Sequence, residues 1–76
     1  MRDFQVECYA GYRGDESPRA VVIRGKRYPV TSILQQWQEP GGRYFKLRLR
    51  GGDECAVFHD DATGSWLEIG HRAVGG

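Results

Sequence analysis

The most constraining feature of this chain is the stretch from Tyr44 to Arg50, in which apolar and polar side chains alternate strictly. The apolar positions are Phe45, Leu47 and Leu49, and the polar positions are Tyr44, Lys46, Arg48 and Arg50. Alternation with a period of two is typical of a strand that has one face on a hydrophobic core and the other in water. We therefore predict a strand over residues 43–50 whose wet face carries three positive charges and a tyrosine.

Glycine-containing turns separate this strand from its neighbours. Residues 39–42 read Glu-Pro-Gly-Gly, which places Pro and Gly at the two central positions of a type II turn. Residues 51–53 close the next hairpin, and Gly64 ends a further turn over residues 60–64. An earlier turn is marked by Gly25 and Lys26. The other predicted strands cover residues 2–10, 19–24, 27–30, 54–59 and 65–69, and residues 11–18 form a polar loop.

These elements predict an all-β fold of five to six antiparallel strands in a meander. A meander this small exposes its edges, and curling hides them. We therefore expect a small SH3-like barrel or a strongly bent sheet. Residues 1–69 are predicted to form a single small β domain, and residues 70–76 a disordered tail.

Two details of the central part stay open. Residues 31–38 are either the continuation of a strand bent by a bulge near Thr31 and Ser32, or a short helical turn capped by one of them. The bent strand is favoured because an eight-residue helix between two hairpins would be short. Pro29 has no N–H, so its strand lies at a sheet edge or directs that position to solvent.

Composition narrows the function classes. The chain has 76 residues and a formal net charge of +1, whereas a nucleic-acid-binding domain is usually distinctly basic, so only a local patch could bind DNA or RNA. Cys8 and Cys55 stand far apart, which favours two buried thiols over a disulfide framework. The chain has no stretch that resembles a signal peptide and no apolar run near the ~20 residues of a spanning helix. We expect a cytoplasmic protein that does not associate with membranes.

Residues suited to catalysis or metal binding are few. His59 precedes Asp60 and Asp61, but the second histidine, His71, falls in the predicted tail, and zinc ligands are usually closely paired in sequence. Cys55 and His59 are four residues apart in a predicted strand, which separates them by about 13 Å. We therefore predict no enzymatic activity, no cofactor and no bound metal. An enzyme that uses His59 and Asp60 is the least favoured reading.

The basic face of the 43–50 strand is the main functional candidate. Aromatic and basic side chains displayed together on a curved sheet are how small barrels bind single strands, because rings stack on bases and cations follow phosphates. A second basic group lies in the neighbouring hairpin. The candidate nucleic-acid-binding residues are Tyr44, Lys46, Arg48, Arg50, Arg24, Lys26 and Arg27.

Two alternatives compete with this hypothesis. The basic face can be an ordinary solvated surface whose charges meet cross-strand acids such as Glu54 or Glu68. The chain can also be a protein–protein interaction module that uses a strand edge or an exposed Trp37, since Trp and Arg dominate interface hot spots. Trp37 and Trp66 are otherwise expected to pack in the core or at its rim.

A spaced set of residues over nearly the whole chain resembles a family of short uncharacterised bacterial cytosolic proteins, a domain of unknown function. The residues that carry this resemblance are Val6, Cys8, Tyr9, Gly11, Tyr12, Arg13, Gly25, Lys26, Arg27, Tyr28, Val30, Trp37, Glu39, Pro40, Tyr44, Phe45, Lys46, Arg48, His59, Asp60, Thr63, Gly64 and Trp66. The segment from about Trp37 to Leu67 also resembles a region near the C-terminus of some catalytically degenerate Y-family polymerase-like proteins. The first resemblance implies no activity. The second implies an accessory role around DNA repair and carries over no catalytic residue.

Overall fold

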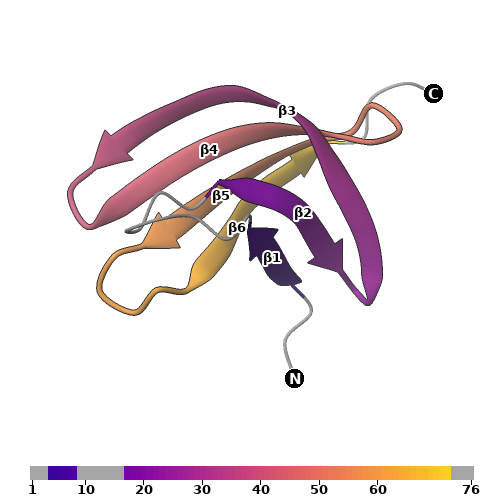
Figure 1. The fold of residues 1–76 in the computed structure, drawn as a ribbon. Helices are drawn as coiled ribbons and strands as arrows, with labels where there is room; N and C mark the ends of the chain where they lie inside the picture. The colour runs from indigo at the N-terminus through magenta and orange to yellow at the C-terminus, as the bar shows by residue number, and fades with distance from the viewer. Residues whose placement is uncertain (1–3, 9–16, 73–76) are drawn as a thin grey trace.

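The computed structural model describes residues 4–8 and 17–72, which form one six-stranded antiparallel sheet in which every strand pairs with its neighbour in the sequence (Figure 1). The strands are β1 (Phe4–Cys8), β2 (Pro18–Ile23), β3 (Lys26–Glu39), β4 (Gly42–Leu49), β5 (Glu54–Asp60) and β6 (Trp66–Arg72). The prediction of an all-β meander is confirmed. The sheet curls into a half-barrel, in which the two edge strands β1 and β6 approach each other across the open side.

The curl depends on β3, which is long and bent (Figure 1). Its first part pairs with β2 and its second part with β4, and the register shifts between Val30 and Ser32 and again between Ile33 and Gln35. The Thr31 hydroxyl donates a 3.2 Å hydrogen bond to the carbonyl oxygen of Arg48 at the first shift. An extra residue in one strand bends it and increases its twist. The bulged strand predicted for residues 31–38 is therefore confirmed, and the helical alternative is wrong.

Pro29 lies at the point where β3 changes partner. It pairs with Ala20 of β2, the following residue pairs with Leu49 of β4, and the Pro29 carbonyl accepts a 2.8 Å hydrogen bond from the Arg50 N–H. The strand lies between β2 and β4, so the first of the two alternatives predicted for Pro29, an edge strand, is wrong. Its missing N–H falls where one ladder ends and the next begins.

The core lies on the inner side of the curl. Phe45, Leu47 and Leu49 are at most 2% exposed, as their alternation predicts, and Val21, Cys55 and Val57 complete the buried cluster. Each buried side chain of this size contributes roughly 1.5–3 kcal/mol to folding. The core therefore fixes which face of β4 points outward.

The β2–β3 turn and the end of β6 differ from the prediction. The turn between β2 and β3 consists of Arg24 (φ 51°) and Gly25 (φ 82°), one residue earlier than predicted, because a two-residue turn of type I′ needs positive φ at both positions. β6 continues to Arg72, so residues 70–72 belong to a strand rather than to a tail. Residues 73–76 and most of the predicted 11–18 loop lie outside the described part of the chain.

Candidate nucleic-acid interface

An apolar row crosses the outer face of the sheet, the side opposite the core. Strand register places Trp37 of β3, Tyr44 of β4, Phe58 of β5 and Leu67 of β6 side by side. The Trp37 and Tyr44 rings stack with centroids 5.2 Å apart and planes 13° apart, and the Tyr44 and Phe58 rings lie 4.7 Å apart at 46°. Trp37 is 43% exposed and Leu67 is 50% exposed. Flat aromatic surface is therefore presented to solvent at one end of this row.

Gly42 sets the position of Phe58 in the apolar row. A Cβ on Gly42 would lie 2.5 Å from Cζ and 2.8 Å from Cε1 of Phe58, and it would collide with the backbone oxygen of His59. The Phe58 ring thus covers a strand position that has no side chain. Covering a strand glycine with a cross-strand ring is a known way to stabilise a sheet, and here it brings Phe58 against Tyr44.

Basic side chains occupy the same face further along the strands. Lys46 and Arg48 follow Tyr44 at steps of two residues, about 7 Å each. Arg48 pairs with Glu54 of β5, which in turn pairs with Arg72 of β6. We call Lys46, Arg48 and Arg72 the basic cluster; all three are exposed.

Glu54 lies among these cations. Its carboxylate is 3.9 Å from Nζ of Lys46 and 3.6 Å from Nη2 of Arg48. Exposed ion pairs of this kind contribute about 0–1 kcal/mol, and one carboxylate cannot neutralise three cations. Glu68 does not contribute, since it pairs with Val57 and faces the inside of the curl. The solvated-surface alternative thus applies to part of this charge, and a net positive charge remains.

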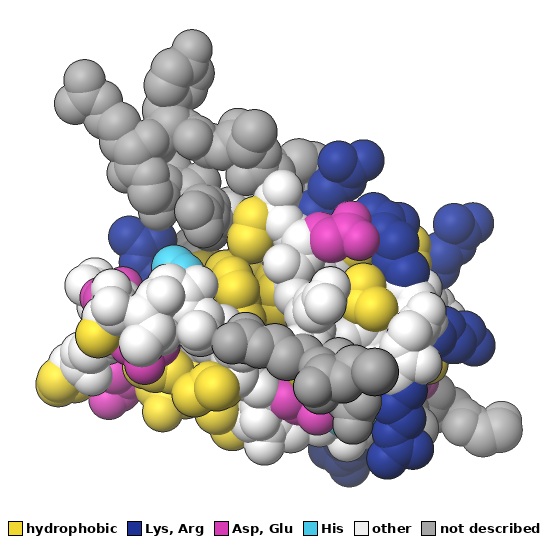
Figure 2. Space-filling model, turned by 90° about the horizontal axis from the view of Figure 1, so that it is seen from below, with side chains coloured by type: hydrophobic (Ala, Val, Ile, Leu, Met, Phe, Trp, Pro, Cys, Tyr) yellow, Lys and Arg dark blue, Asp and Glu magenta, His cyan; other side chains and the backbone are white. Residues whose placement is uncertain are grey.

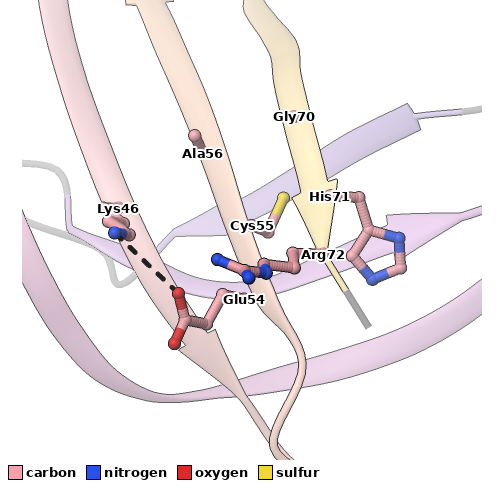
Figure 3. A pocket seen from close by; sticks show the side chains of 7 residues that line it. All are labelled: Lys46, Glu54, Cys55, Ala56, Gly70, His71 and Arg72. Atoms are coloured by element: carbon pink, nitrogen blue, oxygen red, sulfur yellow. Dashed lines mark ion pairs between the residues drawn. The ribbon is translucent and has the colours of Figure 1, made fainter. Parts of the chain in front are cut away.

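A hollow opens inside the basic cluster (Figure 3). It has a volume of about 300 Å³, and its lining includes Lys46, Glu54, Ala56, Gly70 and Arg72. Lys46 pairs with Ala56, and Ala56 pairs with Gly70, so two neighbouring strands present almost no side chain here. In Figure 3 the Arg72 side chain extends from β6 over β5 toward Lys46 and Glu54.

The predicted group in the β2–β3 hairpin does not join this face. Arg24 and Lys26 line a separate hollow of about 500 Å³ with Glu68 on the inner side. Arg27 lies elsewhere again, with its Nε 3.0 Å from Oε1 of Glu7. Arg50 is exposed in the β4–β5 turn.

Lys and Arg side chains gather toward the right side of Figure 2, the side on which Figure 1 shows the β2–β3 and β4–β5 turns. The opposite end is acidic. Glu39 pairs with Gly42, which pairs with Asp60, so both carboxylates lie beyond the apolar row on the side away from the basic cluster. Asp61 is exposed in the adjoining turn.

The chemical character of the outer face therefore changes along the strands. It runs from acidic side chains through the apolar row to the basic cluster.

The residues considered for catalysis are dispersed. His59 stacks on Trp66 with ring centroids 4.4 Å apart, on the inner side of the sheet. Asp60 accepts a 2.9 Å hydrogen bond from the N–H of Ala62, as a turn-forming aspartate does. Over residues 4–8 and 17–72, no group of three His, Cys, Asp or Glu side chains lies close enough to hold a metal ion.

The two cysteines differ in environment. Cys8 is half-buried and Cys55 is buried, as predicted for the second of them. Burial, with a smaller contribution from the negative charge of Glu68, raises the pKa of the Cys55 thiol to about 11. A thiol held protonated in this way is a poor nucleophile.

Sequence reasoning found Tyr44, Lys46 and Arg48 and missed four residues of the same face: Gly42, Phe58, Leu67 and Arg72. Pairing residues across the 60–64 turn would have aligned Phe58 with Leu67 and placed both beside Tyr44. Arg72 was hidden by the bulge at Ile69, which shifts the register between Val57 and Ala56. Trp37 was expected in or near the core, but it lies on the outer face; Trp66 does pack against the core.

Comparisons of this chain with protein-family models, with curated proteins and with solved structures found no match. Among the residues that the structure describes, no helix is long and apolar enough to cross a membrane.

Proposed function

We propose that this protein binds single-stranded nucleic acid on the outer face of β3–β6. Bases stack on the apolar row, and phosphates lie over the basic cluster. The observation that carries this proposal is the stacked Trp37–Tyr44 pair, in which Trp37 is exposed, on the same face as Lys46 and Arg48. Stacking of a base on an aromatic side chain contributes about 1–3 kcal/mol per base and does not depend strongly on sequence.

The charge distribution supports one orientation of the bound strand. The carboxylates of Glu39 and Asp60 would repel phosphates on one side of the apolar row, whereas Lys46, Arg48 and Arg72 attract them on the other. The strand therefore crosses β3 to β6 roughly perpendicular to the protein strands. The three spacings between the four strands, at about 4.8 Å each, give the apolar row a length of about 14 Å.

The apolar row also favours single strands over duplexes. Bases in a duplex stack on one another and present only their edges in the grooves. A planar aromatic surface such as the Trp37–Tyr44 pair can stack only on a base that is unpaired. A duplex would contact the basic cluster alone.

The test is fluorescence anisotropy with labelled single-stranded dT and rU 12-mers and with a duplex of the same length, at 50 and 200 mM salt. We expect single strands to bind more tightly than the duplex, with an affinity that falls steeply with salt. The variant K46Q/R48Q/R72Q should weaken binding by at least tenfold, and Trp37→Ala by about fivefold to a hundredfold, the range for one lost stack.

The matched control is R24Q/K26Q, which removes two cations that lie off the proposed face. Its affinity should stay within twofold of the unaltered protein. Absence of binding at 50 mM salt and high micromolar protein refutes the proposal. Binding that survives K46Q/R48Q/R72Q would show that the proposed face is wrong.

A protein partner is the second candidate, and the exposure of Trp37 and Leu67 favours it. Both belong to the apolar row, and exposed aromatic and aliphatic side chains anchor protein interfaces. Such binding would depend weakly on salt and would be lost in Trp37→Ala but retained in K46Q/R48Q/R72Q. Isothermal titration of a partner isolated on the unaltered protein, against both variants, distinguishes the two candidates.

A further inference from the structure

Gly70 follows the bulge at Ile69 in β6, but neither steric crowding nor a positive φ requires glycine at this position. A Cβ at this position would meet no atom within 4 Å, and its φ is not in the left-handed region. Glycine inside a strand costs about 0.5–1 kcal/mol relative to alanine, and it often marks a place where a ligand approaches the backbone closely. At Gly42, by contrast, a Cβ would collide with its neighbours. The absence of a side chain at Gly70 therefore leaves the space above it open.

That space is the hollow of about 300 Å³ between Lys46 and Arg72. Ala56 on the adjacent strand contributes one methyl group to its floor. Lys46 and Arg72 come from β4 and β6, whose axes lie about 10 Å apart with β5 between them. The Arg72 side chain bridges part of that width, because it extends over β5 toward Lys46 (Figure 3).

We propose that this hollow is a phosphate seat, which holds one phosphodiester of the bound single strand between Lys46 and Arg72. This inference rests on the proposed function, and it adds where one phosphate of the bound strand is held. An ammonium and a guanidinium that converge on an open floor suit a tetrahedral anion, because both donate charge-assisted hydrogen bonds to its oxygens.

The position of the phosphate seat relative to the apolar row fits one nucleotide. Lys46 lies two residues after Tyr44 in β4, and its partner Ala56 lies two residues before Phe58 in β5, a step of about 7 Å along the strands. A base that stacks on the apolar row and the phosphate attached to the same sugar can therefore be bound by neighbouring positions. Glu54 lies at the far side of the phosphate seat and forms ion pairs with Lys46 and Arg48. A bound phosphate would replace the Glu54 carboxylate as the partner of these cations.

The test fills the phosphate seat with an added side chain and leaves every charged residue in place. Gly70→Ala and Gly70→Leu add side chains of increasing size, and Gln5→Leu, on the exposed side of β1, is the control for an added leucine. Each protein is titrated with the labelled dT 12-mer at several salt concentrations. We expect Gly70→Leu to weaken binding about tenfold and Gly70→Ala about twofold.

The salt dependence shows whether a phosphate contact was lost. The logarithm of the affinity falls with the logarithm of salt concentration with a slope near −0.7 per phosphate bound by a single-strand-binding protein. Gly70→Leu should make this slope shallower by about 0.7, and Gln5→Leu should leave it unchanged. Arg72→Gln, in which Gly70 is intact, should reduce the slope by the same amount. This variant decides the question if Gly70→Leu does not fold.

The outcomes separate the two proposals. If the unaltered protein does not bind the 12-mer, the proposed function fails. If it binds, but Gly70→Leu and Arg72→Gln keep its affinity and slope, the phosphate seat is refuted and the proposed function stands. Inorganic phosphate, added at constant ionic strength, is the probe for a free anion site. Displacement of the 12-mer from unaltered protein by low millimolar phosphate would overturn the assignment to a phosphodiester.

Discussion

Replacing Gly42 with alanine should destabilise the fold substantially, although it adds one methyl group. The added Cβ would lie 2.5 Å and 2.8 Å from two Phe58 ring carbons, well inside the optimal 3.5–4.0 Å between carbon atoms. The ring can rotate, but the backbone oxygen of His59, which is closer still, is held by the pairing of Gly42 with Asp60. Relief therefore requires β4 and β5 to separate locally.

The size of the effect follows from two opposing terms. Overpacking of a fixed environment costs typically 1–3 kcal/mol, and replacement of a strand glycine returns about 0.5–1 kcal/mol. The free energy of unfolding should fall by about 1–2 kcal/mol, against a total of roughly 4–11 kcal/mol for 76 residues. For a domain of this size the corresponding fall in Tm is about 4–16 °C.

Urea denaturation followed by the fluorescence of the two tryptophans measures this change. Gly70→Ala is the matched control, since its Cβ meets nothing, and it should be as stable as the unaltered protein or slightly more stable. If Gly42→Ala proves as stable as Gly70→Ala, the close contact of Phe58 with β4, and the position of the apolar row that depends on it, are wrong.

Three further changes test other parts of the structure. Arg24→Asn should raise the free energy of unfolding by about 1 kcal/mol, because Arg24 has φ 51° and asparagine tolerates that conformation better; an unchanged Tm would show that no strain is stored in the turn. Since burial and Glu68 raise the pKa of Cys55 from 9.0 to about 11, the folded state holds the thiol proton to higher pH than the unfolded state. The free energy of unfolding should therefore be unaffected by this group well below pH 9 and fall by about 2–3 kcal/mol between pH 9 and pH 11. Cys55→Ala should lack this component, which urea melts at several pH values would detect. Glu54→Gln should tighten binding of the dT 12-mer about twofold to fivefold, in keeping with the small energies of exposed ion pairs, and an unchanged anisotropy curve would mean that the bound strand does not compete with Glu54.

The core face of β4 could be predicted because its signal is local. The alternation from Tyr44 to Arg50 is bounded by strong turn signals on both sides. No other secondary structure, and no other choice of buried face, fits this stretch. The bulge at Thr31 was also predictable, because Tyr28 and Ile33 are out of phase within what must be one strand. In both cases a single stretch of sequence contains all the information that the inference needs.

The composition of the candidate site depends on register between strands, which sequence alone defines poorly. Arg72 joins Lys46 only because an extra residue at Ile69 shifts β6, and nothing in the pattern of residues 65–72 marks that shift. The separation of Arg24 from Lys46 depends on the bend of β3, which turns the β2–β3 hairpin inward. No local sequence pattern predicts the angle of such a bend.

The order of the strands has a consequence for how the chain folds. Each pairing joins neighbours in the sequence, so each step closes one short loop at a small entropic cost. Topologies dominated by such local pairings fold faster than all-β proteins that depend on distant pairings. The approach of β1 to β6 joins segments that are distant in the sequence, and it has to wait until the four strands between them have assembled. We therefore expect the half-barrel to grow outward from its hairpins and to curl last.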